Sequence, residues 1–76
     1  MIVRRRAGPL ETVWVKVPED ALEAYEAAFD NACDTVGFFR DETTGDWRVE
    51  GVKPVGENDA ELNAGLLLAA AASGVT

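Results

Sequence analysis

The sequence predicts a small α+β domain of the ferredoxin-like kind, a two-layer sandwich in which two helices pack on one face of an antiparallel sheet. The expected elements follow the order strand, helix, strand, strand, helix, which matches five elements of the βαββαβ plan. Hydrophobic residues recur every second position in the strands and every third or fourth position in the first helix. The last strand of the plan is missing or very short, since only Val75-Thr76 follow the second helix.

Size and composition limit the chain to one domain. It has 76 residues, of which 47% are hydrophobic, and this is enough apolar surface to close a core. Residues 1–10 are predicted to be a flexible arm, because three arginines and Gly8-Pro9 precede the first alternating segment. Residues 11–76 should form the single domain.

The first strand should cover residues 12–17, where the side chains alternate in character. The alternation gives two faces: Val13, Val15 and Val17 would lie under the helices, and Trp14 and Lys16 would lie on the open side. A tryptophan on an open face either packs against further structure or anchors a partner, since tryptophan is enriched among interface hot spots.

The first helix should begin near Pro18, which suits the first turn of a helix, and should run to Ala32 or Cys33. One apolar stripe is formed by Ala21, Leu22, Tyr25, Ala28, Phe29 and Ala32. The opposite side carries an acidic row, Glu19, Glu23, Glu26 and Asp30, whose spacing is typical of a solvated face.

Two further strands, 36–41 and 47–53, should form a hairpin. The turn between them contains Gly45, which is able to take a positive φ. If Trp47 and Val49 face the helices, Arg48 and Glu50 join Trp14 on the open side of the sheet.

The second helix should run from about Asp59 to Ala72, with Asn58 as its N-cap and Glu61 completing a capping box. Residues 64–72 include no polar side chain. The consecutive leucines Leu66, Leu67 and Leu68 spread over roughly 200° of a helix, too wide for one small sheet to cover. We expect at least one to pack on the sheet and at least one to face another chain or an absent continuation. The alternative is a leucine left in water, which is common.

The residues offer no catalytic, cofactor-binding or metal-ligating set. The chain has no histidine and therefore no imidazole base or ligand. Cys33 is its one cysteine and is expected to be a buried structural residue. The glycines are scattered and form no phosphate-binding loop. We therefore expect a protein that is not an enzyme by itself and that binds a partner.

Charge indicates what kind of partner to expect. Seven basic residues stand against fourteen acidic ones, and three of the seven are in the predicted arm. Such a surface repels phosphate backbones and anionic membranes and attracts basic proteins, so neither nucleic acid nor a membrane is expected as a partner. The alternative is that acidity only maintains solubility. The candidate partner-binding residues are Trp14, Lys16, Arg48, Glu50, Glu19, Glu23 and Glu26.

Nothing in the sequence predicts export. The longest fully apolar run, residues 66–72, is far shorter than the ~20 residues that cross a bilayer. At the N-terminus the arginines follow the apolar residues, the reverse of the order in a signal peptide. A cytoplasmic location is expected.

Three segments together resemble a known family. Residues 13–18, the hairpin 38–50 and the alanine- and leucine-rich helix after Asn58 are similar to the N-terminal domain of PrmA methyltransferases, which modify the eleventh protein of the large ribosomal subunit. The resemblance covers about residues 11–76.

The resemblance implies a substrate-recognition role. In that family this region presents a basic ribosomal protein to a separate domain that binds S-adenosylmethionine, and no Asp-x-Gly-x-Gly cofactor loop occurs in this chain. The alternative is a stand-alone ferredoxin-like module that forms a homodimer and binds a small metabolite.

Overall fold

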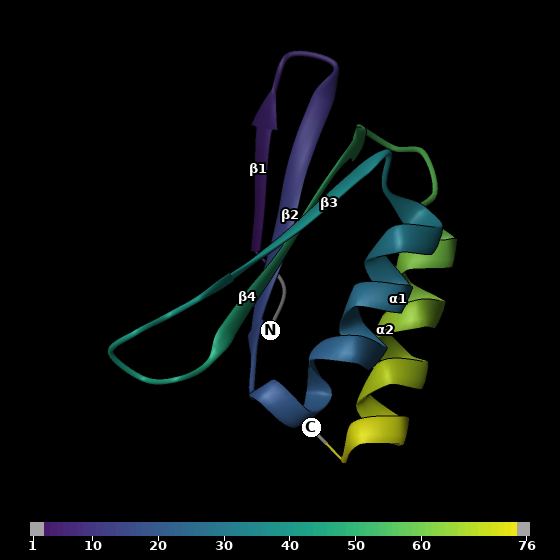
Figure 1. Cartoon of the computed structure of the whole chain (residues 1–76). Coiled ribbons are helices and arrows are strands. Elements are labelled where there is room, and N and C mark those ends of the chain that lie inside the picture. The colour runs from purple at the N-terminus through teal and green to yellow at the C-terminus, as the bar shows by residue number, and fades with distance from the viewer. Residues whose placement is uncertain (1–2, 75–76) are drawn as a thin grey trace.

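The computed structural model describes residues 3–74, which fold into a four-stranded antiparallel sheet and two α-helices (Figure 1). The strands are β1 (Val3–Ala7), β2 (Leu10–Val17), β3 (Thr35–Arg40) and β4 (Trp47–Pro54). A 3-10 turn, η1 (Glu19–Ala21), precedes α1 (Leu22–Ala32), and α2 (Asp59–Ser73) ends the described chain. The strand order is β1-β2-β4-β3, with every neighbouring pair antiparallel. The prediction of a small α+β domain with an antiparallel sheet is confirmed.

The prediction of a flexible arm over residues 1–10 is wrong for its described part. Val3–Ala7 forms strand β1, which pairs with β2 at the edge of the sheet, and Leu10 already belongs to β2. Gly8, with φ 64°, and Pro9 form the tight turn between the two strands. Every residue of β1 is exposed, so backbone pairing rather than side-chain burial defines this strand.

The predicted last strand lies outside the described residues. The sequence leaves Val75 and Thr76 for it, and the structure describes neither of them, nor residues 1 and 2. The sheet edge beside β2 is occupied by β1. The edge beside β4 is occupied by β3.

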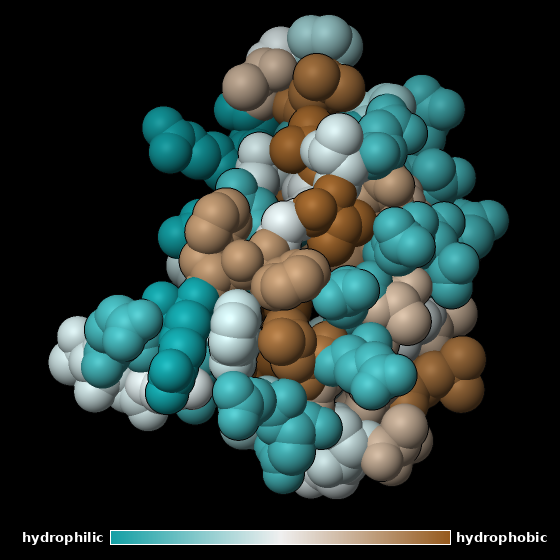
Figure 2. Space-filling view, viewed as in Figure 1, coloured by the Kyte–Doolittle hydropathy of each residue, from teal (hydrophilic) through white to brown (hydrophobic). Residues whose placement is uncertain are grey.

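The core lies between the sheet and the helices, as predicted from the alternation in β2. Val13, Val15 and Val17 are buried, and Val49 of β4 joins them opposite Val15. The helices contribute Phe29 from α1 and, from α2, Leu62 and Ala69. In Figure 2 hydrophobic side chains form a band along the middle of the face shown, and hydrophilic side chains gather over the helices.

Both helices lie on the same side of the sheet, and α2 packs along α1 (Figure 1). The two helices approach closely at Gly65, where a Cβ atom would lie 3.0 Å from the Cβ of Ala28. The predicted capping box at the start of α2 is not formed: Asn58 has φ 59° and makes no side-chain cap bond to α2. Its side-chain Nδ2 instead donates to the carbonyl oxygen of Ala32 at 3.3 Å, at the end of α1.

Candidate functional site

The open face of the sheet carries a ridge formed by Trp14 and Arg48. The register pairs Trp14 with Glu50 and Lys16 with Arg48, which places all four side chains on the face away from the helices, as predicted. The guanidinium carbon of Arg48 lies 4.0 Å from the centroid of the Trp14 ring, and its Nε lies 3.0 Å from Glu50 Oε2. The cation–π contact and the ion pair together hold the guanidinium group of Arg48 over the Trp14 ring.

A second ion pair connects β2 to the β3–β4 turn. Lys16 Nζ donates to Asp41 Oδ2 at 2.7 Å, and Asp41 Oδ1 accepts from the backbone N–H of Thr43 at 2.9 Å. The hydrogen bond from Lys16, followed by the backbone bond from Thr43, lowers the pKa of Asp41 to about 2. Asp41 was not among the predicted site residues, because the alternation within one strand does not reveal which turn a lysine reaches.

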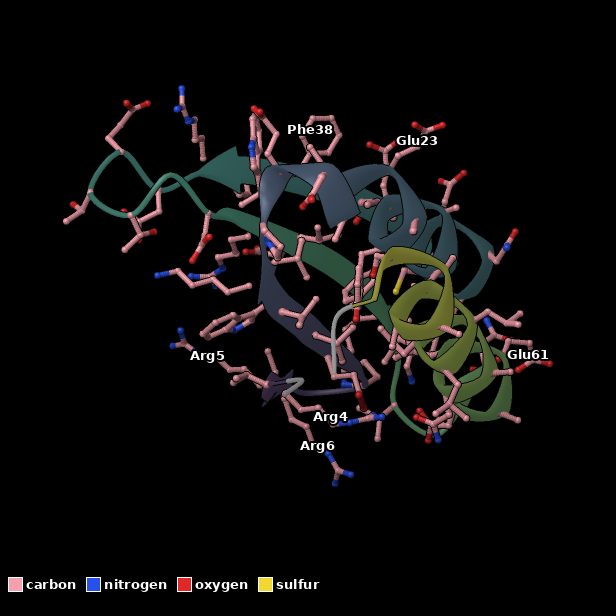
Figure 3. All side chains as sticks on the ribbon, turned by 90° about the horizontal axis from the view of Figure 1, so that it is seen from below. Arg4, Arg5, Arg6, Glu23, Phe38 and Glu61 are labelled. Carbon is pink, nitrogen blue, oxygen red and sulfur yellow. The ribbon has the colours of Figure 1, made fainter. Side chains whose placement is uncertain are left out.

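The ridge separates two hollows on the open face. One, of about 340 Å³, lies toward β3 and is lined by Phe39, Arg40 and Asp41 with Lys16 and the ridge. The other, of about 490 Å³, lies toward β1 and includes Arg5. Figure 3 shows Arg5 pointing away from the helices, while Arg4 and Arg6 extend on the other side of β1.

Besides Asp41, sequence reasoning missed Arg5 and Phe39 on this face. Arg5 was assigned to an arm, and Phe39, whose side chain is 58% exposed, was read only as part of a hairpin strand. The signal for Phe39 was available, since it is three residues after the half-buried Val36 and therefore on the opposite face of β3.

The helical layer, meaning η1, α1 and α2, is acidic throughout. It contains no lysine or arginine: all seven basic residues of the chain lie in strands. Glu19 and Glu23 are exposed as predicted, while Glu26 is half-buried, and Figure 3 shows Glu23 and Glu61 pointing outward. The helical layer therefore carries seven of the fourteen acidic residues and none of the seven basic ones, while the other seven acidic residues lie in strands and loops.

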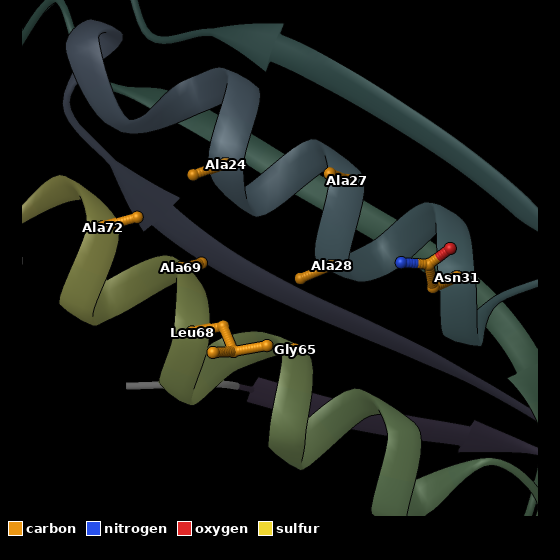
Figure 4. A pocket seen from close by; sticks show the side chains of 8 residues that line it. All are labelled: Ala24, Ala27, Ala28, Asn31, Gly65, Leu68, Ala69 and Ala72. Carbon is orange, nitrogen blue, oxygen red and sulfur yellow. The ribbon is translucent and has the colours of Figure 1, made fainter.

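The three consecutive leucines of α2 divide between inside and outside, as predicted. Leu66 packs against the core, whereas Leu67 and Leu68 are 74% and 71% exposed. Leu68 also lines a groove of about 220 Å³ between α1 and α2, whose other walls are mainly alanine and glycine (Figure 4). The outer side of α2 is thus apolar beside an acidic α1.

Glu11 and Lys53, which no sequence argument singled out, are 1% and 0% exposed between the sheet and α2. Lys53 Nζ lies 2.7 Å from Asp59 Oδ1 and 3.8 Å from Glu11 Oε1, and it donates to the carbonyl oxygen of Glu57 at 2.8 Å. Arg4 pairs with both Glu11 and Asp59. Hydrogen bonds from Lys53 and then from Arg4 lower the pKa of Asp59. The cluster binds β1, β2, β4 and α2 together, which is a structural role.

The alternation of side chains along the two strands would have revealed this cluster. Glu11 is in phase with Val13, and Lys53 is in phase with Val49, so both side chains point toward the helices.

The remaining chemistry of the described residues is sparse. Cys33 is half-buried, and burial raises the pKa of its thiol, which disfavours the nucleophilic thiolate. Within residues 3–74 there is no group of three or more His, Cys, Asp or Glu side chains placed to hold a metal ion. No helix in that range is long and apolar enough to cross a membrane.

Comparisons of the chain with protein-family models, with curated proteins and with solved structures found no match. Inferences about function therefore depend on the surfaces described above: the open face with its ridge, the acidic helical layer, and the apolar outer side of α2.

Proposed function

We propose that this chain is a non-catalytic recognition domain whose acidic helical layer binds a basic segment of another protein. The observation that supports this is the complete absence of lysine and arginine from η1, α1 and α2, where Glu19 and Glu23 are exposed. A layer with one sign of charge steers an oppositely charged partner into contact and accelerates association.

The resemblance to the PrmA family narrows the proposed partner to a basic ribosomal protein, which places the function in the cytoplasm. On this proposal the chain holds the protein substrate, and a separate domain supplies S-adenosylmethionine and transfers the methyl group. What supports a variant of the ferredoxin-like plan is the position of β1, which takes the edge beside β2 that the last strand of the plan would otherwise fill.

The test is to reverse acidic charge on the helical layer and measure association with the eleventh protein of the large ribosomal subunit. In the double variant Glu19→Lys, Glu23→Lys, the association rate at low salt should fall about tenfold, since steering charges are removed. The matched control, Glu42→Lys with Glu57→Lys, makes the same change in net charge at exposed positions outside the helical layer. Equal rates for the two double variants would overturn the proposal, and so would a rate for the unmodified chain that does not change with salt.

The recognition role also predicts the outcome of a cofactor-binding measurement. Calorimetry with S-adenosylmethionine should give no heat of binding to this chain, because its described residues include no glycine-rich loop before a helix that would hold the cofactor. Micromolar binding would contradict the assignment of the chemistry to another domain.

A second candidate function, homodimerisation, is favoured by the exposure of Leu67 and Leu68. A two-fold dimer would bring the same patch of two copies together. In sedimentation experiments Leu67→Glu should then shift a dimer to a monomer with unchanged helical content. Ala60→Glu, at an exposed position in the first turn of α2, is the control that should leave the dimer intact. A strict monomer at high concentration would exclude this candidate.

A further inference from the structure

The open face of the sheet has the opposite charge balance from the rest of the chain. Three of the seven basic residues have side chains on this face, namely Arg5, Lys16 and Arg48, but only two of the fourteen acidic residues line its hollows, Asp41 and Glu50. The chain as a whole has a formal net charge of −7. This excess of positive charge is formed by residues from β1, β2 and β4, so it does not appear as a basic run in the sequence.

Arg5 is the one of these cations without a carboxylate partner. Lys16 is paired with Asp41 and Arg48 with Glu50, but within residues 3–74 Arg5 forms no ion pair. Arg5 lies in the hollow toward β1, on one side of the Trp14–Arg48 ridge. Arg40 is opposite Trp47 in the register, so its side chain leaves β3 on the helix side. The guanidinium group of Arg5 is therefore available for an anion, and a guanidinium suits the geometry of a phosphate.

The same face presents planar side chains beside Arg5. Phe39 is largely exposed on β3, and the guanidinium group of Arg48 lies over the Trp14 ring in the central strands. Aromatic rings and stacked arginine planes on an open sheet are the surfaces on which single-stranded nucleic acids stack their bases. An acidic peptide would gain only the charge contacts and would leave these planar surfaces unused.

We propose that the open face binds a short single strand of nucleic acid. Bases stack on Phe39 and on the Trp14–Arg48 ridge, and Arg5 contacts a phosphate at the end of the strand near β1. The total charge of the chain predicts that it repels nucleic acid. The acidic helical layer, however, lies on the other side of the sheet from the open face (Figure 3). The proposal is independent of the recognition of a basic protein, because the two surfaces are separate.

The decisive measurement compares charge reversal at two neighbouring arginines of β1. A fluorescently labelled oligo-uridylate is titrated with protein at low salt, and binding is followed by anisotropy. Arg5→Glu should weaken binding about tenfold, because it places a negative charge beside a phosphate. Arg6→Glu makes the same change one residue later on β1, where the side chain points to the other side, and should change binding less than about twofold. Equal losses in both variants would overturn the proposal, because attraction would then depend on net charge alone.

Stacking is tested separately. Phe39→Ala should weaken binding about fivefold or more with the circular dichroism spectrum unchanged, because a base loses its stacking partner. In a Trp47→Phe background the remaining tryptophan, Trp14, reports directly on the face, and its fluorescence should be quenched by the oligonucleotide. Unquenched fluorescence, an unaffected Phe39→Ala variant, or displacement of the oligonucleotide by an equal charge of polyglutamate would each overturn the proposal. So would the absence of any binding at low salt.

Discussion

Lys53 is a charged residue in the core of a very small domain, and its ammonium group is stabilised there by four oxygen atoms. They belong to the carboxylates of Asp59 and Glu11 and to the carbonyls of Glu57 and Pro54. Removing Lys53 from this cluster leaves Glu11 buried with Arg4 as its remaining cationic partner.

The first prediction concerns this buried lysine. Lys53→Met nearly keeps the length of the side chain but removes its charge, and it should lower the free energy of unfolding by up to about 3–5 kcal/mol, because Glu11 remains buried with only Arg4 to balance its charge. The control is Lys16→Met, which breaks an exposed pair and should cost about 0–1 kcal/mol. Urea denaturation of both variants makes the comparison. Similar losses would mean that the buried cluster contributes no more than a surface pair.

The second prediction concerns the pH range in which Asp41 contributes to stability. Its pKa is about 2 in the folded chain and near its ordinary value of 3.8 in the unfolded chain. Because the folded pKa is the lower one, the contribution is complete above about pH 4 and is lost as the pH falls toward 2. In the Asp41→Asn variant, the urea midpoint should therefore fall less between pH 4 and pH 2 than it does in the unmodified chain.

Carbon-13 NMR gives an independent measurement of the same carboxyl. In Lys16→Met the pKa of Asp41 should rise toward 3.8 without reaching it, because the backbone N–H of Thr43 still donates to the carboxylate. An unchanged titration midpoint would exclude Lys16 as the main cause.

At the scale of elements, the contact between β4 and the end of α1 requires a glycine. A Cβ atom at Gly51 would lie 2.5 Å from Cys33 Sγ and 3.0 Å from Phe29 Cδ2, closer than packed atoms approach. Phe29 of α1 is fully buried, and Cys33, the half-buried residue that follows α1, packs against the core, so the space for a new atom is confined.

The third prediction follows from this close approach. Gly51→Ala should destabilise the chain by about 1–3 kcal/mol through overpacking, measured by thermal or urea unfolding. Gly37→Ala, on the adjacent strand, adds a Cβ that would meet only the Phe39 ring at 3.5 Å, an ordinary contact, and should cost less. Adding Cys33→Ala to Gly51→Ala should recover part of the loss, since the sulfur is the nearest atom. A double variant no more stable than Gly51→Ala would contradict this explanation.

The elements differed in how far the sequence determined them. β2, α1 and β4 each contain a buried face, so their periodicity predicted them well. α2 was predicted instead from Asn58, Glu61 and the apolar residues 64–72. β1 has no buried residue, and its pairing with β2 depends on the turn at Gly8, so its side chains carry no periodic signal. The open-face residues of β2 and β4 were predicted by alternation alone. Arg5 and Asp41 were missed because only the assembled sheet brings them to that face.

At the scale of the whole molecule, charge is divided by layer. The helical layer contains only acidic charges, while every basic residue lies in a strand. Several of the basic residues are already paired with carboxylates of the sheet, so much of the negative charge on the helices is left to repel itself.

The fourth prediction concerns the response of stability to salt. Raising the salt concentration from low to physiological should increase the urea midpoint, because screening reduces repulsion among the acidic residues more than it weakens the few exposed ion pairs. Glu23→Lys should reduce this increase. A midpoint that falls with salt would mean that the exposed ion pairs outweigh the repulsion.

The exposed strand β1 has a consequence for aggregation. The edge of a sheet is a template on which another chain is able to add a strand, and proteins often protect it with charge. Arg4, Arg5 and Arg6 are consecutive in β1, so two copies approaching through this edge would bring three arginines from each into contact. The opposite edge, β3, has one arginine and exposes Phe38 and Phe39. If copies of this chain add strand to strand during storage or folding, we expect the contact to begin at β3.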